Sequence, residues 1–294
     1  MATMLMQPAS VATGMRPATP GADIVARVRC AKRLFCTAYI SPEAPGQGGQ
    51  EAIVAKYPLA IVPQDDGAHA VAWRDRVRRL NPSIILLGYQ QVIEETTVPG
   101  PGHERMRQVQ GAWATYPGGF VPTVRGPAGS ERHIFDPRNA DWQQAFVEAC
   151  GATLAAYPYD GLFLDQCTVY TRASLSPLAR AEMRSALQAT LLRLRRGHPA
   201  ALLVGNSARA WNGLNGELNE ARLADMASAC ASTARHAVPE IKLYQSLLGR
   251  ATSTESVQRE MALAHKCGAF FGAAADYQHV PWLDAFDAVR SPCT

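Results

Sequence analysis

Short apolar runs alternate with longer stretches of helical periodicity from about residue 33 to the end of the chain. This alternation predicts repeated strand and helix units on a parallel sheet. Eight runs have the length and composition of strands: 34–40, 59–64, 84–90, 161–166, 201–206, 216–220, 242–248 and 270–276. Eight such units in about 250 residues predict an α/β fold of the (β/α)8 TIM-barrel type.

Three of the intervening segments carry clear helical signatures. The segment 177–197 begins with Pro177, repeats apolar residues at helical spacing and ends at Gly197, a pattern that suits a helix from its first position to its end. Residues 142–154 carry a similar apolar stripe, and Thr252-Ser253-Thr254-Glu255 is typical of a capping box before a third helix. We interpret the aromatic and Met residues of these stripes as core.

Residues 91–140 interrupt the alternation. They combine a helical stretch, a short apolar run and turns rich in Gly and Pro. Counting them as barrel strands would exceed eight, so we interpret them as a long excursion after the third strand. In a barrel, such a loop on the catalytic face forms a wall of the substrate site. The predicted organisation is an N-terminal extension or linker at residues 1–30 and one barrel domain at residues 31–294.

Composition and charge narrow the possible partners. The 294 residues are 47% hydrophobic and 18% charged, and the absence of an apolar run of about 18 residues argues against a membrane partner. The net charge is +4, and its arginines cluster on expected helix faces without aromatic residues between them, which argues against nucleic-acid binding. These clusters are Arg74, Arg76, Arg78 and Arg79, and Arg193, Arg195 and Arg196. Residues 1–21 lack the pattern of a secretory signal.

Cysteine and histidine patterns point to no metal site and no cofactor. The seven cysteines are odd in number and contain no C-x-x-C motif, so we expect reduced, mostly buried thiols and folding in the cytoplasm. The seven histidines form no H-x-H or H-E-x-x-H motif. The prediction is therefore chemistry by side chains alone.

Two segments with similar patterns carry the functional signal. Residues 160–165 and 215–220 each begin with a turn dipeptide, continue as a strand and end on a carboxylate, Asp165 and Glu220. In a barrel the carboxyl ends of all strands open onto one face. Two carboxyl groups on that face can flank a glycosidic bond, one as acid and the other as nucleophile or base. The alternative is that each carboxylate caps a helix or pairs with an arginine such as Arg172 or Arg222.

Strand alternation leaves a choice at the second acid. In the segment 216–220, Leu218 and Glu220 lie on one face of a regular strand, whereas Glu217 and Asn219 lie on the other. The sequence does not say which face is inward, so Glu217 remains a rival for the acid. Polar residues near other strand ends suit a carbohydrate substrate, because sugars are bound by polar planar groups and aromatic faces. These residues are Tyr39, Gln64, Asp65, Tyr89, Asn206, Gln245 and Asp276.

A family resemblance agrees with this interpretation. It rests on Phe135-Asp136-Pro137, Asp141-Trp142, Tyr159-Asp160-Gly161-Leu162-Phe163-Leu164-Asp165 and Leu203-Val204-Gly205-Asn206-Ser207. The chain resembles, over roughly residues 33–280, the (β/α)8 glycoside hydrolases related to endo-α-1,4-polygalactosaminidases. The resemblance implies Asp165 as nucleophile or base. It places Glu220 at a later acidic position where such proteins often show Asp-Gly-x-x-x-Glu, although Asn215 stands here for the Asp. We add Asp136 to the candidate substrate-binding residues.

The sequence therefore predicts a glycosidase that cleaves a polysaccharide or an amino-sugar polymer. The alternative is a non-catalytic glycan-binding or structural barrel, for example in a virus tail or another larger assembly, in which the carboxylates only bind sugar. The two hypotheses differ at the sixth strand, because hydrolysis by two carboxylates requires the second acid and binding does not. Oligomeric state is left open.

Overall fold

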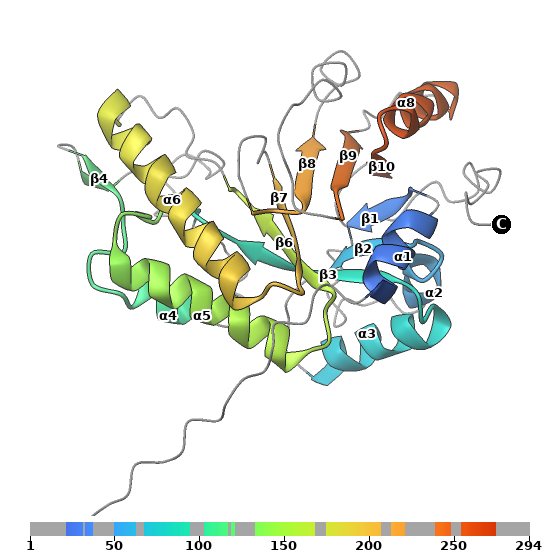
Figure 1. Cartoon of the computed structure of the whole chain (residues 1–294), viewed down its shortest axis with the longest axis horizontal. Helices are drawn as coiled ribbons and strands as arrows, with labels where there is room; N and C mark the ends of the chain where they lie inside the picture. Colours follow the sequence, from blue (N-terminus) through green and yellow to red (C-terminus); the bar gives the residue numbers. More distant parts are fainter. Residues whose placement is uncertain are drawn as a thin grey trace, which may run out of the picture.

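The barrel is built from eight parallel strands that belong to a single sheet (Figure 1). The strands are β1 Phe35–Thr37, β2 Leu59–Val62, β3 Ile85–Gln91, β6 Gly161–Asp165, β7 Leu202–Asn206, β8 Gly216–Glu220, β9 Ile241–Leu247 and β10 Phe270–Ala274. They neighbour one another in that order, and a parallel bridge between Leu34 and Phe271 joins the first to the last. The predicted (β/α)8 fold is confirmed, and each predicted run overlaps one of these strands.

These elements come from a computed structural model of the chain. It describes residues 22–31, 33–37, 50–62, 68–94, 103–116, 119–120, 133–167, 175–206, 213–220, 239–247 and 254–274. The helices in these ranges are α1 Ala22–Cys30, α2 Gln50–Val54, α3 Ala68–Leu80, α4 His103–Arg107, α5 Ala140–Ala156, α6 Pro177–Gly197 and α8 Thr254–Lys266. In this part of the chain, no helix is both long and apolar enough to cross a membrane.

The helices predicted from apolar stripes form as expected. Ser176 caps α6 by accepting a hydrogen bond from the backbone N–H of Ala179, and Pro177 occupies its first turn. In α5, Asn139 is the cap, and Trp142 and Phe146 are fully buried. Both helices bury their stripes in one cluster against the outer face of the sheet. The stripes are therefore core.

The excursion after β3 lies outside the barrel sheet, as predicted. It contains α4 and a separate two-stranded antiparallel sheet of β4 Thr115–Tyr116 and β5 Gly119–Phe120. Trp113 stacks on Phe135 with ring centroids 4.5 Å apart, and Phe135 packs against Trp142 of α5 at 5.7 Å. This row of aromatic rings fixes the excursion to the helical layer.

The inside of the barrel is a separate apolar cluster. It takes alternate residues from the strands, namely Phe35, Leu59, Ile61, Ile85, Leu87, Phe163, Leu202, Val204, Leu218, Ile241, Leu243 and Phe270. Intervening residues such as Leu162, Leu164 and Leu203 pack outward against helices. This alternation identifies the inward face of each strand. On β10 the cluster contains only Phe270. The residue two positions later, Gly272, faces Phe35, since a Cβ at Gly272 would lie 2.8 Å from that ring.

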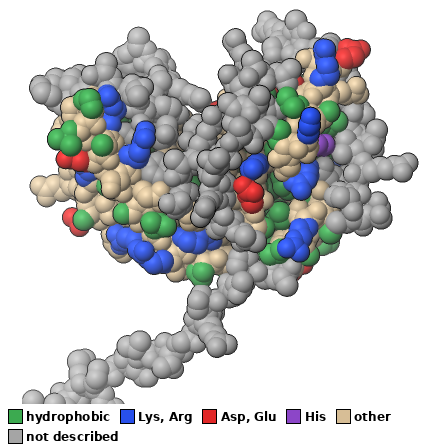
Figure 2. All heavy atoms as spheres, turned by 45° about the horizontal axis from the view of Figure 1, so that its top comes forward, with side chains coloured by type: hydrophobic (Ala, Val, Ile, Leu, Met, Phe, Trp, Pro, Cys, Tyr) green, Lys and Arg blue, Asp and Glu red, His purple; other side chains and the backbone are tan. Residues whose placement is uncertain are grey.

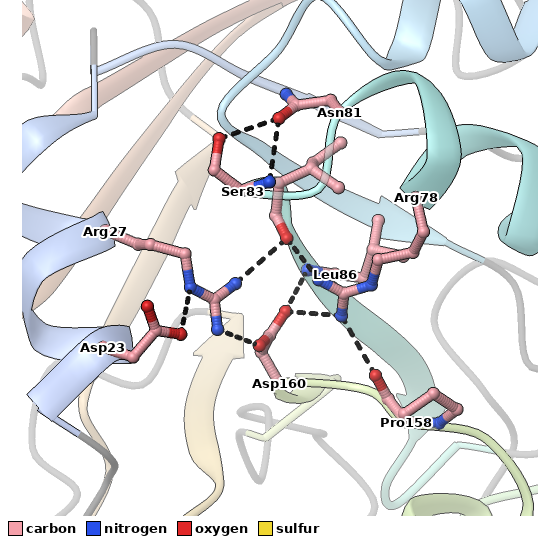
Figure 3. A network of polar contacts seen from close by, with 9 residues as sticks. Asp23, Arg27, Arg78, Asn81, Ser83, Leu86, Pro158 and Asp160 are labelled. Atoms are coloured by element: carbon pink, nitrogen blue, oxygen red, sulfur yellow. Dashed lines mark hydrogen bonds and ion pairs between the residues drawn. The ribbon is translucent and has the colours of Figure 1, made fainter.

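At the amino end of the strands, Asp160 joins α1 and α3 to the barrel (Figure 3). Its carboxylate accepts hydrogen bonds from Arg27 at 2.6 Å and from Arg78 at 2.8 Å. The backbone N–H of Leu86 donates to the same carboxylate at 2.9 Å. In addition, Val28 of α1 packs into the interior cluster. Helix α1, which lies within the residues expected to be an extension, therefore covers the floor of the barrel.

Arginines on the helix faces form ion pairs with neighbouring helices. Arg76 of α3 contacts Glu51 of α2 at 2.7 Å, and Arg105 of α4 contacts Glu148 of α5 at 2.7 Å. On the face shown in Figure 2, Lys and Arg side chains are spread over both flanks, with Asp and Glu among them. The charge of these helices thus contributes to contacts between them.

The cysteines correct one prediction. Cys36, Cys150 and Cys167 are free and buried, as expected. Cys30 and Cys267 are disulfide-bonded, so the prediction of reduced thiols is wrong for these two. Their position explains the error, because each lies close to the contact where Arg33 donates to the Gly268 carbonyl at 2.5 Å and the two ends of the barrel meet. Cys230 and Cys293 lie outside the described residues.

Candidate functional site

Polar side chains line the inner face of the barrel near the carboxyl ends of five strands. Tyr89, Asp165, Asn206, Glu220 and Gln245 each stand two residues after an interior apolar residue of the same strand. Because side chains two apart on a strand share a face, all five point inward. The structure thus brings together five of the predicted site residues at the end of the barrel where (β/α)8 enzymes place their active sites.

Asp165 and Glu220 lie at the same level of the barrel. The registered pairs lead from strand to strand around the sheet and back to β1 through the Leu34–Phe271 bridge. The residue reached in this way lies about eight positions nearer the amino end of the chain than the starting residue of β1. This offset is the shear of the fold. At constant height the chain position therefore advances by about one residue per strand. Asp165 neighbours Asn206, and Asn206 pairs with Leu218. Two strands from Asp165, the level residue is consequently Glu220.

Three donors hold the Asp165 carboxylate. Tyr89 Oη lies 2.6 Å from Oδ2, and Asn206 Nδ2 donates to Oδ1 at 2.8 Å. The backbone N–H of Gln166 also donates to Oδ1, at 2.8 Å. The two side-chain donors come from β3 on one side of β6 and from β7 on the other. The carboxylate is therefore oriented from both sides.

The backbone turns sharply directly after Asp165. Gln166 has a φ of 55°, in the left-handed region that is uncommon for residues other than glycine. Its side-chain Oε1 is buried and has no hydrogen-bond partner among the described residues. Such strain concentrates at functional sites. Asp165 does not cap α6, because Ser176 is the cap of that helix, and the possible partners Arg172 and Arg222 lie outside the described residues.

The interior cluster shows which of Glu217 and Glu220 faces the inside of the barrel. Leu218 belongs to the interior cluster, so Glu220 faces inward and Glu217 faces the outside of the sheet. Glu217 is only 1% exposed, and Asn219 donates to its Oε1 at 3.2 Å. Glu220 is half-buried. Only Glu220 therefore shares the inner face with Asp165.

Gln245 lies beside Glu220. The two residues are registered partners on β9 and β8. Gln245 is 1% exposed, and its side-chain Oε1 has no hydrogen-bond partner among the described residues. A buried acceptor without a hydrogen bond costs about 1–3 kcal/mol of stability, and a ligand that donates a hydrogen bond to this oxygen would remove that cost.

Asp136 is placed differently from the other candidates. Arg138 binds its carboxylate through Nε at 2.9 Å and Nη2 at 2.7 Å, and also reaches Glu182 of α6 at 3.1 Å. The hydrogen bonding that Arg138 donates to the Asp136 carboxylate is the largest cause of the raised pKa of Arg138. Asp136 thus joins the turn before α5 to α6, and its role toward substrate stays a prediction. Four other predicted site residues, Tyr39, Gln64, Asp65 and Asp276, lie outside the described residues.

Gln91 is a site residue that the sequence did not reveal. Its Oε1 lies 2.5 Å from Tyr89 Oη. The signal was a glutamine two residues after a tyrosine at the end of an apolar strand, which places both on one face.

Among the residues that the structure describes, no group of three or more His, Cys, Asp or Glu is arranged to hold a metal ion.

Sequence comparison gives no relative: no protein family profile matches, and no curated protein does. Solved structures do resemble the chain. A variant of the glycoside hydrolase domain of PelA from Pseudomonas aeruginosa superposes with a TM-score of 0.56 at 13% identity, over 84% of this chain and 96% of that one. The glycoside hydrolase domain of PgaB (BpsB) from Bordetella bronchiseptica gives 0.56 at 12% identity, over 87% and 97%.

A larger enzyme shares the same barrel. The α-galactosidase TtGalA from Thermus thermophilus, in complex with stachyose, gives a TM-score of 0.56 at 16% identity, over 90% of this chain and 67% of that chain. Identities this low establish the fold alone. The chain therefore has the (β/α)8 fold seen in these glycoside hydrolases.

Proposed function

We propose that the chain is a glycoside hydrolase that cleaves a polysaccharide or an amino-sugar polymer, with Asp165 as nucleophile or base and Glu220 as general acid. The observation that carries the proposal is the shared level of these two inward carboxyl groups. The solved structures with the same fold support the reaction class, since they are glycoside hydrolases. The relation to endo-α-1,4-polygalactosaminidases rests on the sequence resemblance.

The shared level of Asp165 and Glu220 determines how far apart their carboxyl groups lie. Neighbouring strands are about 4.8 Å apart, so Cα atoms on alternate strands lie roughly 10 Å apart, and the inward side chains shorten the gap. Carboxyl separations of about 5 to 9.5 Å serve glycosidases. Glu220 gives its proton to the leaving glycosidic oxygen. Asp165 either attacks the anomeric carbon or takes a proton from the water that does.

The surrounding groups supply substrate contacts. The buried Oε1 of Gln245 requires a hydrogen-bond donor and lies beside Glu220. Sugar hydroxyl and amide N–H groups are such donors, so Gln245 binds the ring held between the two carboxyl groups. Asn206 holds Asp165 through Nδ2 and so keeps that carboxylate directed toward the same ring. No cofactor enters the proposed reaction.

The test compares three variants, in each of which one carboxyl group is replaced by the amide of the same size. Hydrolysis is measured on a panel of p-nitrophenyl glycosides and on galactosamine-containing polysaccharides, as released nitrophenol or reducing ends. The wild type is expected to cleave at least one substrate. Asp165→Asn and Glu220→Gln should each lose at least about 100-fold in kcat. Glu217→Gln, the matched control on the outward face of β8, should keep its activity.

Two results would count against the proposal. If Glu217→Gln loses activity and Glu220→Gln keeps it, the assignment of the acid is wrong. If the wild type binds these glycans and cleaves none, the alternative of a non-catalytic glycan-binding barrel replaces hydrolysis.

A further inference from the structure

One tyrosine hydroxyl lies between two oxygens that both accept hydrogen bonds. Tyr89 Oη is 2.6 Å from Asp165 Oδ2 and 2.5 Å from Gln91 Oε1. A tyrosine hydroxyl has one hydrogen, so it cannot donate to both. Either Asp165 donates to Tyr89, or the Gln91 amide is turned so that its Nε2 faces the hydroxyl.

The second arrangement leaves Asp165 as a carboxylate, the form in which it can act as nucleophile or base. The oxygen and nitrogen of a glutamine amide exchange places by a half-turn that moves no other atom. With Nε2 toward Tyr89, Gln91 donates to Tyr89 and Tyr89 donates to Asp165. The other oxygen of Asp165 already accepts from Asn206 and from the Gln166 N–H. A carboxylate with N–H donors on Oδ1 and an O–H donor on Oδ2 acts as an acceptor at both oxygens.

We infer that Tyr89 is a positioning residue that gives its single hydroxyl hydrogen to Asp165, with Gln91 as the donor behind it. Tyr89 is half-buried, and its ring lies against Phe163 with centroids 6.0 Å apart. The ring is thus supported by the residue that precedes Asp165 on the same inward face of β6. Tyr89 from β3 and Asn206 from β7 then fix the two carboxylate oxygens from opposite sides.

The consequence for catalysis rests on the proposed function. A nucleophile or base must present one oxygen to the reacting centre in a defined direction. Without the hydroxyl, the Asp165 carboxylate turns about its last bond and presents that oxygen less often. Binding of the sugar by other groups is unchanged. The loss therefore falls on kcat, by about 10- to 100-fold, and leaves KM within about threefold.

The experiment uses Tyr89→Phe, which removes only the hydroxyl, and a matched control. In Tyr157→Phe the same oxygen is removed beside Asp75, which it contacts at 3.4 Å at the end of α5. Kinetics are measured on the glycoside that the wild type cleaves, and crystal structures of the wild type and Tyr89→Phe report the Asp165 carboxylate. Gln91→Leu is added alone and together with Tyr89→Phe. Thermal melting confirms that each variant folds.

The expected result is a turned or doubly oriented Asp165 carboxylate in Tyr89→Phe, a drop in kcat there and no change in Tyr157→Phe. Gln91→Leu should lower kcat alone and add nothing in the Tyr89→Phe background, because it acts through that hydroxyl. An unchanged carboxylate in the Tyr89→Phe crystal overturns the inference whether or not the protein is active. Full kcat in Tyr89→Phe overturns it as well. A wild type that cleaves nothing refutes the proposed function instead, and the crystals then decide the inference alone.

Discussion

Asp160→Ala should destabilise the barrel strongly, because it removes a carboxylate that forms ion pairs with two arginines. The Asp160 side chain is 7% exposed, and those of Arg27 and Arg78 are 16% and 22% exposed. The substitution removes two ion pairs and the acceptor of the Leu86 N–H. Breaking a buried pair costs about 3–5 kcal/mol. Both arginines keep the Ile84 carbonyl as an acceptor, so we expect about 3 kcal/mol.

The assay is equilibrium unfolding in urea. Asp23→Ala is the matched control, because Asp23 pairs with the same Arg27 while its side chain is 79% exposed. Such a surface pair contributes at most about 1 kcal/mol. If Asp160→Ala and Asp23→Ala lower the free energy of unfolding equally, the reasoning that α1 is held through a buried carboxylate is refuted.

Three further predictions concern the rest of the fold. Cys30 and Cys267 should resist alkylation until a reductant is added, and reduction should lower the free energy of unfolding by about 2–4 kcal/mol; alkylation of either residue in the unreduced folded protein would contradict this. Burial lowers the pKa of His198 and His265 below the ordinary 6.5, so the unfolded chain binds more protons and the free energy of unfolding should fall as the pH drops below about 6.5. Urea titrations at several pH values check this, and His198→Gln with His265→Gln should flatten the slope. Gly272→Ala places a Cβ 2.8 Å from the Phe35 ring, so overpacking should cost about 1–3 kcal/mol in unfolding experiments; an unchanged melting temperature would show that Phe35 moves freely.

The sequence was most informative where burial leaves a pattern. Apolar runs marked all eight strands, and Asp165 stood out because an acid directly follows the buried residues of β6. The pattern could not choose between Glu217 and Glu220, since alternation defines two faces and does not say which one is inside. That choice needed Leu218 in the interior cluster.

Other features depend on contacts between distant parts of the chain. The Tyr89 to Asp165 contact joins residues from two neighbouring strands through registers that the sequence does not specify. The bonded state of Cys30 and Cys267 likewise follows from closure of the barrel, and their spacing carries no motif. Asp136 looked like a site residue by resemblance, and only the structure showed its pair with Arg138.

The most direct test of the central claim is a crystal structure of Asp165→Asn with a bound oligosaccharide that the wild type cleaves. We predict that the side chains at positions 165 and 220 lie on either side of one glycosidic bond, with the two groups about 5 to 9.5 Å apart. A sugar bound elsewhere on the chain, or Glu220 turned away from the glycosidic oxygen, would contradict hydrolysis by this pair.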